Sequence, residues 1–421
     1  MSKRELFVII IGGGPVGLAA AHALTQANID FVILERNPDT VSDAGSNFVL
    51  LPTGLQALDQ LGLMHAMNRN SDVLCPETYR TDHNAQSIGS VHWFQGYKDS
   101  FGIAPRIISR HDFTRVLFET LPRESQLKIQ TNKKVIDISV INDGVTAICA
   151  DGTSVSGDFV LGADGAHSLV RERIRELALE AGSSKVNEEH PFLTTHRALW
   201  FRFPAKDEFQ IGTSCETHGS PISTQFFVGR QTAVVGVYER LEKPTRERAR
   251  FTQADQDALI SRRDEVLLMK NSNLTLREAY DSRIQSGLVN LEEGVLKHWS
   301  WGGRVVLVGD AAHKYTPSTG AGCNDGIIDV CVLINELNNL LKKLRTTEIG
   351  ADCITESELA AVFEAYQSSR HKVVVQQCKD AGEMTTLASW PGLIEKGSED
   401  GLANAWASIH TYGNTADDRA N

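Results

Sequence analysis

The chain has 421 residues, of which 41% are hydrophobic, and a formal net charge of −11. This length is enough for two domains with a sizeable core, and the acidic balance disfavours nucleic-acid or anionic-membrane partners, which demand clustered Lys and Arg. Seven cysteines without a C-x-x-C pair indicate reduced thiols in a cytoplasmic protein and predict no metal site.

Residues 6–35 have the pattern of a strand, a glycine-rich turn, a small-residue helix and a second strand. In the G-x-G-x-x-G pattern, Gly12 makes the tight turn, Gly14 lets the backbone approach a pyrophosphate, and Gly17 lets the helix pack on the strand. Glu35 ends the second strand, where an acid binds a ribose hydroxyl pair. The unit predicts a site for the ADP half of a dinucleotide at a helix N-terminus, and a bare structural turn is the alternative.

The same segment also resembles a signal peptide or a membrane span, because Lys3 and Arg4 precede an uncharged apolar run. A spanning helix needs about 20 apolar residues, and the glycines with Pro15 would break it near its middle. We therefore expect no stable membrane anchor in this chain.

Further along, residues 53–61 predict a helix, and residues 107–121 predict a strand end followed by an amphipathic helix with Arg110 at the junction. Residues 127–164 alternate between apolar and polar, with a turn signal at 142–144. This pattern predicts hairpins followed by a return to the main sheet.

The next region has short apolar and aromatic runs between residues 194 and 238, which predict a separate antiparallel layer. The main sheet resumes at Val305 and leads into a glycine loop. Helices are expected over residues 325–343 and 357–381. Only one G-x-G-x-x-G pattern occurs, so a nicotinamide would have to bind without a Rossmann unit of its own.

Two further motifs carry a family resemblance. GADGAHSLVR at 162–171 resembles the DG motif, and GDAAH at 309–313, followed by Pro317 and by GAGCN at 320–324, resembles the GD motif, of single-component FAD-dependent aromatic hydroxylases. The resemblance extends to about Trp390. The strings PTRERAR, NLEEGVLKHWSWGGRVVLVGDAAHKYTP and GCNDGI are similar to the fungal natural-product branch, which includes indole-alkaloid spirocyclases and indole-diterpene and meroterpenoid epoxidases.

The resemblance implies an α/β fold: a Rossmann-like FAD-binding domain with an inserted, mostly antiparallel β substrate-binding layer and C-terminal helices. The expected parts are residues 1–185 of the FAD-binding domain with strands of the substrate side near 75–105, an antiparallel substrate-binding domain at 186–285, completion of the FAD-binding domain at 286–390, and a flexible tail at 391–421.

The implied function is that of an oxidoreductase of secondary-metabolite biosynthesis. It would be a monooxygenase with non-covalent FAD that uses NADPH or NADH and O₂ to epoxidise or hydroxylate an electron-rich C=C, such as the indole 2,3-bond. The alternatives are a prenyl-alkene epoxidase and a non-catalytic FAD-binding protein. A reductase or amine oxidase is disfavoured, and so is a flavin halogenase, because the W-x-W-x-I-P motif is absent.

Several residues then acquire expected roles toward FAD. Asp310 ends an apolar strand, where it can accept a hydrogen bond from a ribityl hydroxyl, with a turn-capping Asp as the alternative. Backbone N–H groups before the following helix can face the pyrimidine edge of the flavin. Asp164 fits either a cofactor role or a turn. The expected cofactor-binding set is Gly12, Gly14, Gly17, Glu35, Arg36, Val49, Arg110, Asp164, Asp310, Pro317, Gly320, Gly322, Cys323 and Asn324. Val49 and Cys323 depart from the small residues of relatives and are expected to contact FAD through backbone atoms.

The candidate catalytic residues lie in the antiparallel layer. Arg197 shares strand parity with Leu199 and Phe201, so it projects from an apolar face, and the resemblance implies that it donates to an oxygenated intermediate. Pairing with a carboxylate is the structural alternative. Arg202 is a further candidate, and Tyr238 matches a pocket tyrosine of some relatives, although strand tyrosines commonly only pack. His313 is expected to be structural.

Overall fold

The computed structural model describes residues 6–42, 45–141, 144–346 and 354–389. The chain forms two compact units, the first made of Met1–Ser71, Ile108–Leu193 and Glu292–Cys378, and the second of Asp72–Ile107, Thr194–Leu291 and Lys379–Asn421. The expected tail at 391–421, and residues 142 and 143 of the expected hairpin turn, lie outside the described residues.

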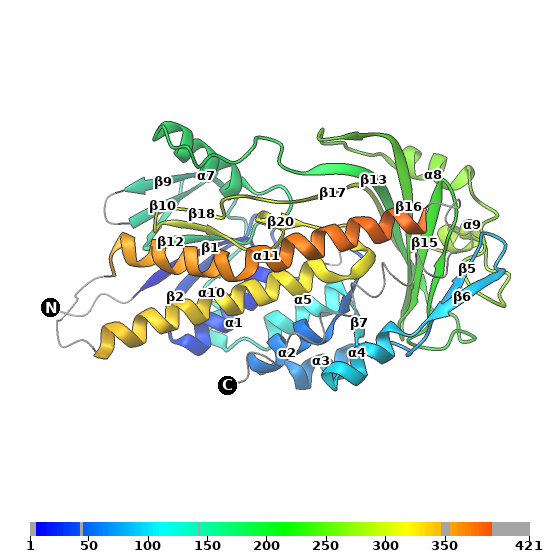
Figure 1. Ribbon diagram of the computed structural model, residues 1–421. Helices are drawn as coiled ribbons and strands as arrows, with labels where there is room; N and C mark the ends of the chain where they lie inside the picture. The colour runs from blue at the N-terminus through cyan, green and yellow to red at the C-terminus, as the bar shows by residue number, and fades with distance from the viewer. Residues whose placement is uncertain (1–5, 43–44, 142–143, 347–353, 390–421) are drawn as a thin grey trace. The chain divides into compact units, whose positions relative to one another are not determined.

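The first unit is built on a six-stranded sheet with the order β18-β19-β12-β1-β2-β8. Figure 1 labels β18, β12, β1 and β2 of this sheet. All neighbouring pairs are parallel except the edge pair β18–β19. The strands are β1 (Phe7–Ile11), β2 (Asp30–Leu34), β8 (Ile129–Gln130), β12 (Phe159–Gly162), β18 (Ser300–Trp301) and β19 (Val305–Leu307).

The central strands are apolar on both faces, as in parallel sheets that are covered on both sides. Ile9 of β1 lies opposite Val32 of β2 and Val160 of β12, and all three are buried. The connecting helix α1 (Pro15–Ala27) begins with proline at its first turn and ends at Asn28 in the left-handed conformation. The predicted β1-α1-β2 unit is therefore confirmed.

Two long helices complete the first unit, α10 (Ala321–Thr346) and α11 (Glu356–Ala388), the latter ending in the second unit's segment. α10 passes α1 closely, because a methyl group at Gly326 would lie 2.7 Å from the Val16 side chain. Shorter helices in this unit are α2 (Pro52–Gln60), α3 (Met64–Asn70), α5 (Arg110–Glu119), α6 (Arg123–Gln126) and α7 (Leu169–Glu180).

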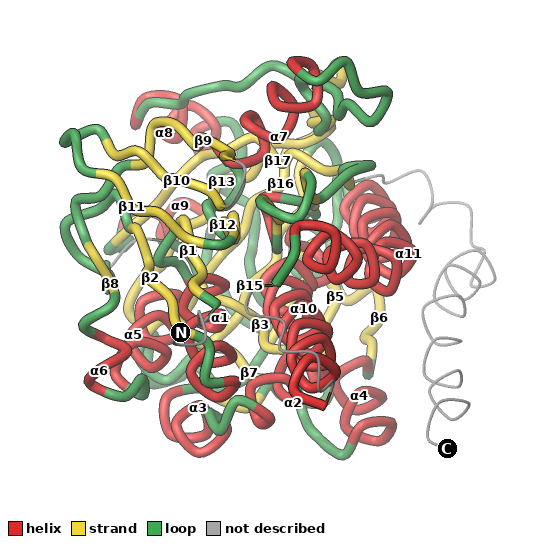
Figure 2. Tube along the Cα trace, turned by 90° about the vertical axis from the view of Figure 1, so that its left-hand side faces the viewer, coloured by secondary structure: helices red, strands yellow, loops and turns green. Residues whose placement is uncertain are grey.

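A small antiparallel sheet stands beside the main sheet in Figure 2. Its order is β11-β10-β9, from Ser154–Gly157, Gly144–Cys149 and Val135–Ile141. A methyl group at Gly157 would lie 2.9 Å from the Phe7 carbonyl oxygen, so this glycine lets the small sheet meet β1. The expected hairpins are confirmed.

The second unit is built on one large sheet, in which β17-β13-β16-β15-β14-β5-β6 follow one another. The pairs β13–β16, β16–β15, β15–β14 and β5–β6 are antiparallel, and β14–β5 is parallel. The strands are β5 (Thr78–Thr81), β6 (Ser87–Val91), β13 (Leu193–Pro204), β14 (Ser214–Thr217), β15 (Ile222–Val228), β16 (Thr232–Thr245) and β17 (Gln285–Val295).

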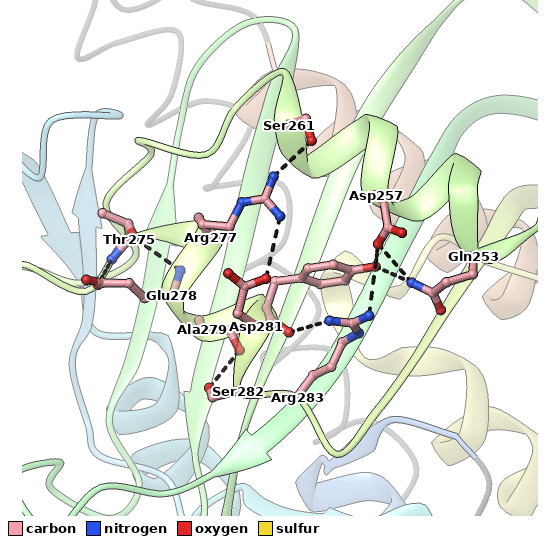
Figure 3. A network of polar contacts seen from close by, with 11 residues as sticks. Gln253, Asp257, Ser261, Thr275, Arg277, Glu278, Ala279, Asp281, Ser282 and Arg283 are labelled. Carbon is pink, nitrogen blue, oxygen red and sulfur yellow. Dashed lines mark hydrogen bonds and ion pairs between the residues drawn. The ribbon is translucent and has the colours of Figure 1, made fainter.

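Helices α8 (Gln253–Ser261) and α9 (Leu276–Asp281) cover one face of this sheet, and each begins with a capping box. Figure 3 shows the polar contacts that join them. Arg277 donates to Ser261 at 2.9 Å, and the Tyr280 hydroxyl, whose ring is fully buried, contacts Asp257 at 2.9 Å. A further helix, α4 (Trp93–Phe101), follows β6 directly in the sequence.

The expected fold class is confirmed. The sequence did not predict α3, α4, α6, α7, α8 or α9. It placed the start of α10 four residues late, since the helix begins directly after Gly320, which stands in the left-handed conformation.

Candidate functional site

The expected cofactor residues of the first unit gather at one edge of its main sheet. Gly12, Glu35, Asp164 and Asp310 all follow the carboxyl ends of β1, β2, β12 and β19, which are neighbouring parallel strands. Backbone hydrogen bonds hold these ends together beyond the strands, from Gly12 N–H to the Leu34 carbonyl at 3.0 Å among others. This edge is where α/β sheets bind their ligands.

The glycine-rich turn has the geometry that each of its glycines requires. Gly12 has φ +104°, and a methyl group there would lie 2.5 Å from the Ala163 carbonyl oxygen. A methyl group at Gly17 would overlap the Gly12 carbonyl oxygen. Nothing lies within 4 Å of a methyl group placed at Gly14, and no side chain caps α1 at that residue. The turn therefore offers open N–H groups at a helix N-terminus.

Glu35 is buried at the end of β2 and orders the turn from the side. Its Oε2 accepts the Gly13 N–H at 2.7 Å, and its Oε1 accepts the Asn37 N–H at 2.8 Å. An ionised carboxylate has about four lone-pair sites, so two remain for a ribose hydroxyl pair. The neighbouring Arg36 is exposed.

Asp310 lies in a 3₁₀ turn, Gly309–Ala311, and its side chain is exposed toward the start of α10. Its Oδ1 lies 4.0 Å from where a methyl group on Gly322 would stand. Burial raises the pKa of the Cys323 thiol to about 12, and the charge of Asp310 adds to the rise while that of Arg110 opposes it. The thiol is therefore protonated at neutral pH, and it lies within electrostatic reach of both charges.

Asn324 connects the start of α10 to β3 (Asn47–Leu50). Its side-chain oxygen accepts the Leu51 N–H at 3.0 Å, and its amide nitrogen donates to the carbonyls of Val49 at 2.9 Å and Gly320 at 2.8 Å. Both the oxygen and the amide nitrogen of this side chain thus have partners within the protein. Val49 lies beside Gly320, whose added methyl group would be 3.3 Å from the Val49 Cβ.

Asp164, Pro317 and Arg110 complete the expected cofactor set, and each has a defined local partner or position. Asp164 accepts from the Ser168 hydroxyl at 2.6 Å and from the Val170 N–H at 3.2 Å, so the structure uses both of its oxygens in the turn before α7. Pro317 begins a 3₁₀ turn, Pro317–Thr319, that leads to Gly320. Arg110 begins α5 and is exposed, and its Cδ lies 2.6 Å from where a methyl group on Gly45 would stand.

These features fit FAD. Open N–H groups at α1 suit a pyrophosphate, the remaining lone pairs of Glu35 suit a ribose, and the exposed carboxylate of Asp310 beside the first turn of α10 suits the ribityl chain. Arg110 supplies a positive charge that, like the charge of Asp310, acts on Cys323. The residues present therefore fit the cofactor that the motifs imply.

In the second unit, Arg197 and Tyr238 lie on opposite faces of the large sheet. Arg197 shares its face with Leu199 and Phe201, as the alternation predicts, and this face is the one that α8 and α9 cover. Its guanidinium pairs with Glu239, which lies directly opposite on β16. Glu239 also forms an ion pair with Arg262 at 3.0 Å.

The other face carries a row of polar side chains that the sequence reasoning missed. The Tyr238 hydroxyl donates to Gln225 at 2.9 Å, Gln225 donates to Glu216 at 3.4 Å, and Glu216 pairs with Arg80 at 3.0 Å. The register places these four residues on adjacent strands. Polar residues alternating with buried apolar ones in β14 and β15 are the signal that could have identified them.

Tyr238 lies directly opposite Ala198, and Arg202 is four residues further along the same strand as Ala198. Because side chains alternate between the faces of a strand, Arg202 and Tyr238 lie on the same face. It is buried and donates to Gln285 at 2.7 Å. Burial raises the pKa of Tyr238 well above its ordinary value, so the phenol is neutral at physiological pH. Of the three candidates, the structure places Arg202 and Tyr238 on one face and Arg197 on the other.

Among the described residues, no helix has both the length and the apolar character needed to cross a bilayer. No group of three or more His, Cys, Asp or Glu side chains in that same part of the chain is arranged to hold a metal ion.

Known proteins match this chain in sequence. The FAD binding domain family matches residues 5–351. The FAD-dependent monooxygenase esdpE of Penicillium shearii is 30% identical over 378 residues, covering 88% of this chain and 76% of that protein. The FAD-dependent monooxygenase DEP2 of Alternaria brassicicola is 30% identical over 398 residues, covering 91% of this chain and 72% of that protein.

Solved structures share the fold at low identity. A p-nitrophenol 4-monooxygenase from Pseudomonas putida has a TM-score of 0.73 at 20% identity, covering 97% of this chain and 94% of that chain. Klebsiella pneumoniae HpxO, solved with FAD and uric acid, has a TM-score of 0.67 at 19% identity, covering 96% and 92%. The chain therefore belongs to the FAD binding domain family, and it is a flavin-dependent monooxygenase.

Proposed function

We propose that this monooxygenase uses NADPH or NADH and O₂ to epoxidise or hydroxylate an electron-rich C=C of a fungal secondary metabolite, with the indole 2,3-bond as the preferred target. The observation that carries the proposal is the set of fitted groups at the carboxyl edge of the first unit's sheet, together with fungal relatives named as FAD-dependent monooxygenases. FAD, once reduced by the nicotinamide, supplies the activation of O₂.

The protein's own share of the reaction is binding and orientation. The open N–H groups of the α1 turn hold the pyrophosphate, and Glu35 holds the adenosine ribose. Asp310 accepts from the ribityl chain. The N–H groups of Gly322 and Cys323, in the first turn of α10, would stabilise negative charge on the pyrimidine edge of the flavin, whereas the Gly320 N–H already donates to the Pro317 carbonyl at 2.9 Å.

We assign substrate recognition to the face of the second unit that carries Tyr238. On this face a neutral phenol lies diagonally across from Trp200, with Arg202 two residues further along β13, and an aromatic, partly polar face suits an indole. Gln225 must present its amide nitrogen to Glu216, which can only accept, so the Tyr238 proton points to the oxygen of Gln225. The Tyr238 oxygen is thereby left to accept from a donor such as an indole N–H.

Arg197 is the second proposed catalytic residue, and two roles compete for it. The family resemblance implies that it would donate a hydrogen bond where negative charge develops during the reaction. Its pair with Glu239 and its place on the face that α8 and α9 cover favour the structural alternative. The variants argued in the Discussion decide between these roles.

Mass spectrometry of products formed under ¹⁸O₂ tests the function. The purified protein with FAD and NADPH is incubated with indole alkaloids, and with prenylated terpenoids as the competing class. Incorporation of one ¹⁸O atom into an indole supports the proposal, and incorporation into a prenyl alkene alone supports the epoxidase alternative. NADH replaces NADPH in a parallel series to identify the electron donor.

A further inference from the structure

Behind the Asp310 turn lies a buried cluster of charged side chains that contributes no group to the cofactor edge. Asp329 on α10 is fully buried, and so are His313, Asp325 and, on α11, Arg370. Two carboxylates and two potential cations therefore occupy the interior of the first unit, where burying an unpaired charge would be costly.

Asp329 is the centre of this cluster. Its Oδ2 accepts the Gly309 N–H at 3.0 Å and the His313 Nε2 at 2.6 Å. Its Oδ1 accepts the Arg370 Nε at 2.8 Å, and the same guanidinium reaches Asp325 at 2.6 Å. Three donors, two from the segment 309–313 and one from α11, thus converge on one carboxylate.

The two contacts of Oδ2 fall at the two ends of the segment 309–313, and Asp310 lies between them. Gly309 has φ +58°, so this turn adopts a backbone conformation that L side chains rarely take. Asp329 lies on the same helix whose first turn approaches the Asp310 carboxylate at Gly322. The carboxylate therefore fixes the turn and the helix relative to each other.

We propose that Asp329 is a positioning residue for FAD: it clamps both ends of the 309–313 turn against α10 and so places the Asp310 carboxylate for the ribityl chain, while Arg370 fixes Asp329 from α11. This inference rests on the proposed contact of Asp310 with FAD. The clamp acts on the flavin half of the cofactor and not on the ADP half, which the α1 turn and Glu35 hold.

Two ligands separate these halves. FAD carries the ribityl chain, and ADP lacks it. We expect Asp329→Asn to raise the dissociation constant of the FAD-free full-length protein for FAD about tenfold, since the amide cannot accept from all three donors. The dissociation constant for ADP should stay within about twofold of the wild-type value. Fluorescence titration measures FAD binding, and calorimetry measures ADP binding.

Four other variants calibrate the result. Asp310→Ala should weaken the binding of FAD and leave the binding of ADP unchanged, and Glu35→Ala should weaken the binding of both ligands. Asp158→Asn is the matched control, because Asp158 is another buried aspartate that accepts a backbone N–H, from Phe7 at 2.7 Å, at the amino end of the sheet. This variant should bind both FAD and ADP with the affinity of the wild-type protein. Arg370→Lys keeps the charge but loses the fork between Asp329 and Asp325, so it should give a weaker form of the Asp329→Asn pattern and serves if that variant does not fold.

Unchanged FAD binding in folded Asp329→Asn and Arg370→Lys, with Asp310→Ala still defective, overturns the clamp alone. Equal loss of FAD and ADP in both clamp variants also overturns it, because this pattern marks general destabilisation. Normal FAD binding by Asp310→Ala overturns the role of Asp310 on which the inference rests. Failure of the wild-type protein to bind FAD overturns the proposed function itself.

Discussion

Glu35 shows how one buried carboxylate can both shape a binding turn and contact the ligand. Its two oxygens already accept the N–H groups of Gly13 and Asn37, so the ribose would meet an acceptor fixed in position. A preorganised acceptor loses little conformational entropy when the ligand binds. Removing it therefore affects the turn and the cofactor together.

We expect Glu35→Ala to weaken FAD binding by about 1 to 3 kcal/mol, the cost of leaving buried partners of a charged acceptor unpaired. Titration of FAD-free protein by flavin fluorescence measures this change. Asp39→Ala removes an exposed acid from the same loop and should leave the affinity unchanged. Wild-type affinity in Glu35→Ala would exclude the ribose contact.

Arg197 makes the second prediction at this scale. If it donates to developing negative charge, Arg197→Ala should lower product formation by about 10² to 10³, as loss of one preorganised donor does, while hydrogen peroxide rises. Arg197→Lys keeps the charge without the planar fork and should recover only part of the rate. FAD binding and reduction by NADPH should persist. Product and peroxide are quantified in the same reactions.

Glu239→Gln is the control for this experiment, because it removes the partner and keeps Arg197. If the arginine only pairs with Glu239, Arg197→Ala and Glu239→Gln should lower the free energy of unfolding alike, by about 0 to 1 kcal/mol for a partly exposed pair. Both variants should then form as much product as the wild-type protein, with no additional hydrogen peroxide. A wild-type product yield in Arg197→Ala would thus return this arginine to a structural role.

At the scale of elements, the start of α10 depends on one side chain. Asn324 has two donors and one acceptor in use, and it is buried, so an aspartate of the same shape would face two carbonyls without a donor. We expect Asn324→Asp to destabilise the protein by about 1 to 3 kcal/mol per unpaired group and to weaken FAD binding.

Urea unfolding of the FAD-free protein measures the first effect, and FAD titration measures the second. Asn273→Asp makes the same substitution at an exposed side chain of the second unit and should have neither effect. Equal behaviour of the two variants would show that the link between α10 and β3 does not support the cofactor edge.

Elements whose pattern is local could be predicted from the sequence. The β1-α1-β2 unit has an apolar strand, a glycine turn and a capped helix within 6–35, and each signal agrees with the next. Strand parity likewise placed Arg197 correctly beside Leu199 and Phe201. Parity alone does not tell which face of a sheet helices cover, and that information comes from α8 and α9, which lie far along the chain.

The clamp around Asp329 could not be predicted for a similar reason. His313, Asp329 and Arg370 are 16 and 41 residues apart in sequence, and only the packing of α11 on α10 brings them together. A buried aspartate inside a helix has no local signature, because its partners lie on other elements. The same holds for Glu216 and Arg80, which are separated by 136 residues.

At the scale of the whole molecule, buried titratable groups link stability to pH. Burial, with the charge of Arg240, lowers the pKa of His196 to about 4. Burial raises the pKa of Glu216, but the His218 hydrogen bond and the charge of Arg80 outweigh it and bring the pKa to about 2. Burial lowers the pKa of His313, and the charge of Asp329 more than reverses this, so the pKa is raised.

The sign of each group's contribution to the free energy of unfolding depends on whether the folded or the unfolded chain is protonated first as the pH falls. His196 is protonated first in the unfolded chain, so its contribution is complete above about pH 6.5 and is lost as the pH falls toward 4. Glu216 contributes fully above about pH 4.5, and this contribution is lost toward pH 2. His313 has the opposite sign, and its contribution is lost as the pH rises through its raised pKa.

We therefore expect acid to destabilise the second unit in two successive steps. His196→Gln should cost about 1 kcal/mol at pH 7 through its hydrogen bond to Ser389, but should flatten the decline between pH 6.5 and 4. Glu216→Gln should flatten the decline below pH 4.5 and leave the upper step intact. Hydrogen exchange read by mass spectrometry follows peptides of each unit separately, so the first unit provides an internal reference. A decline of wild-type shape in both variants would show that neither group titrates as its burial and partners require.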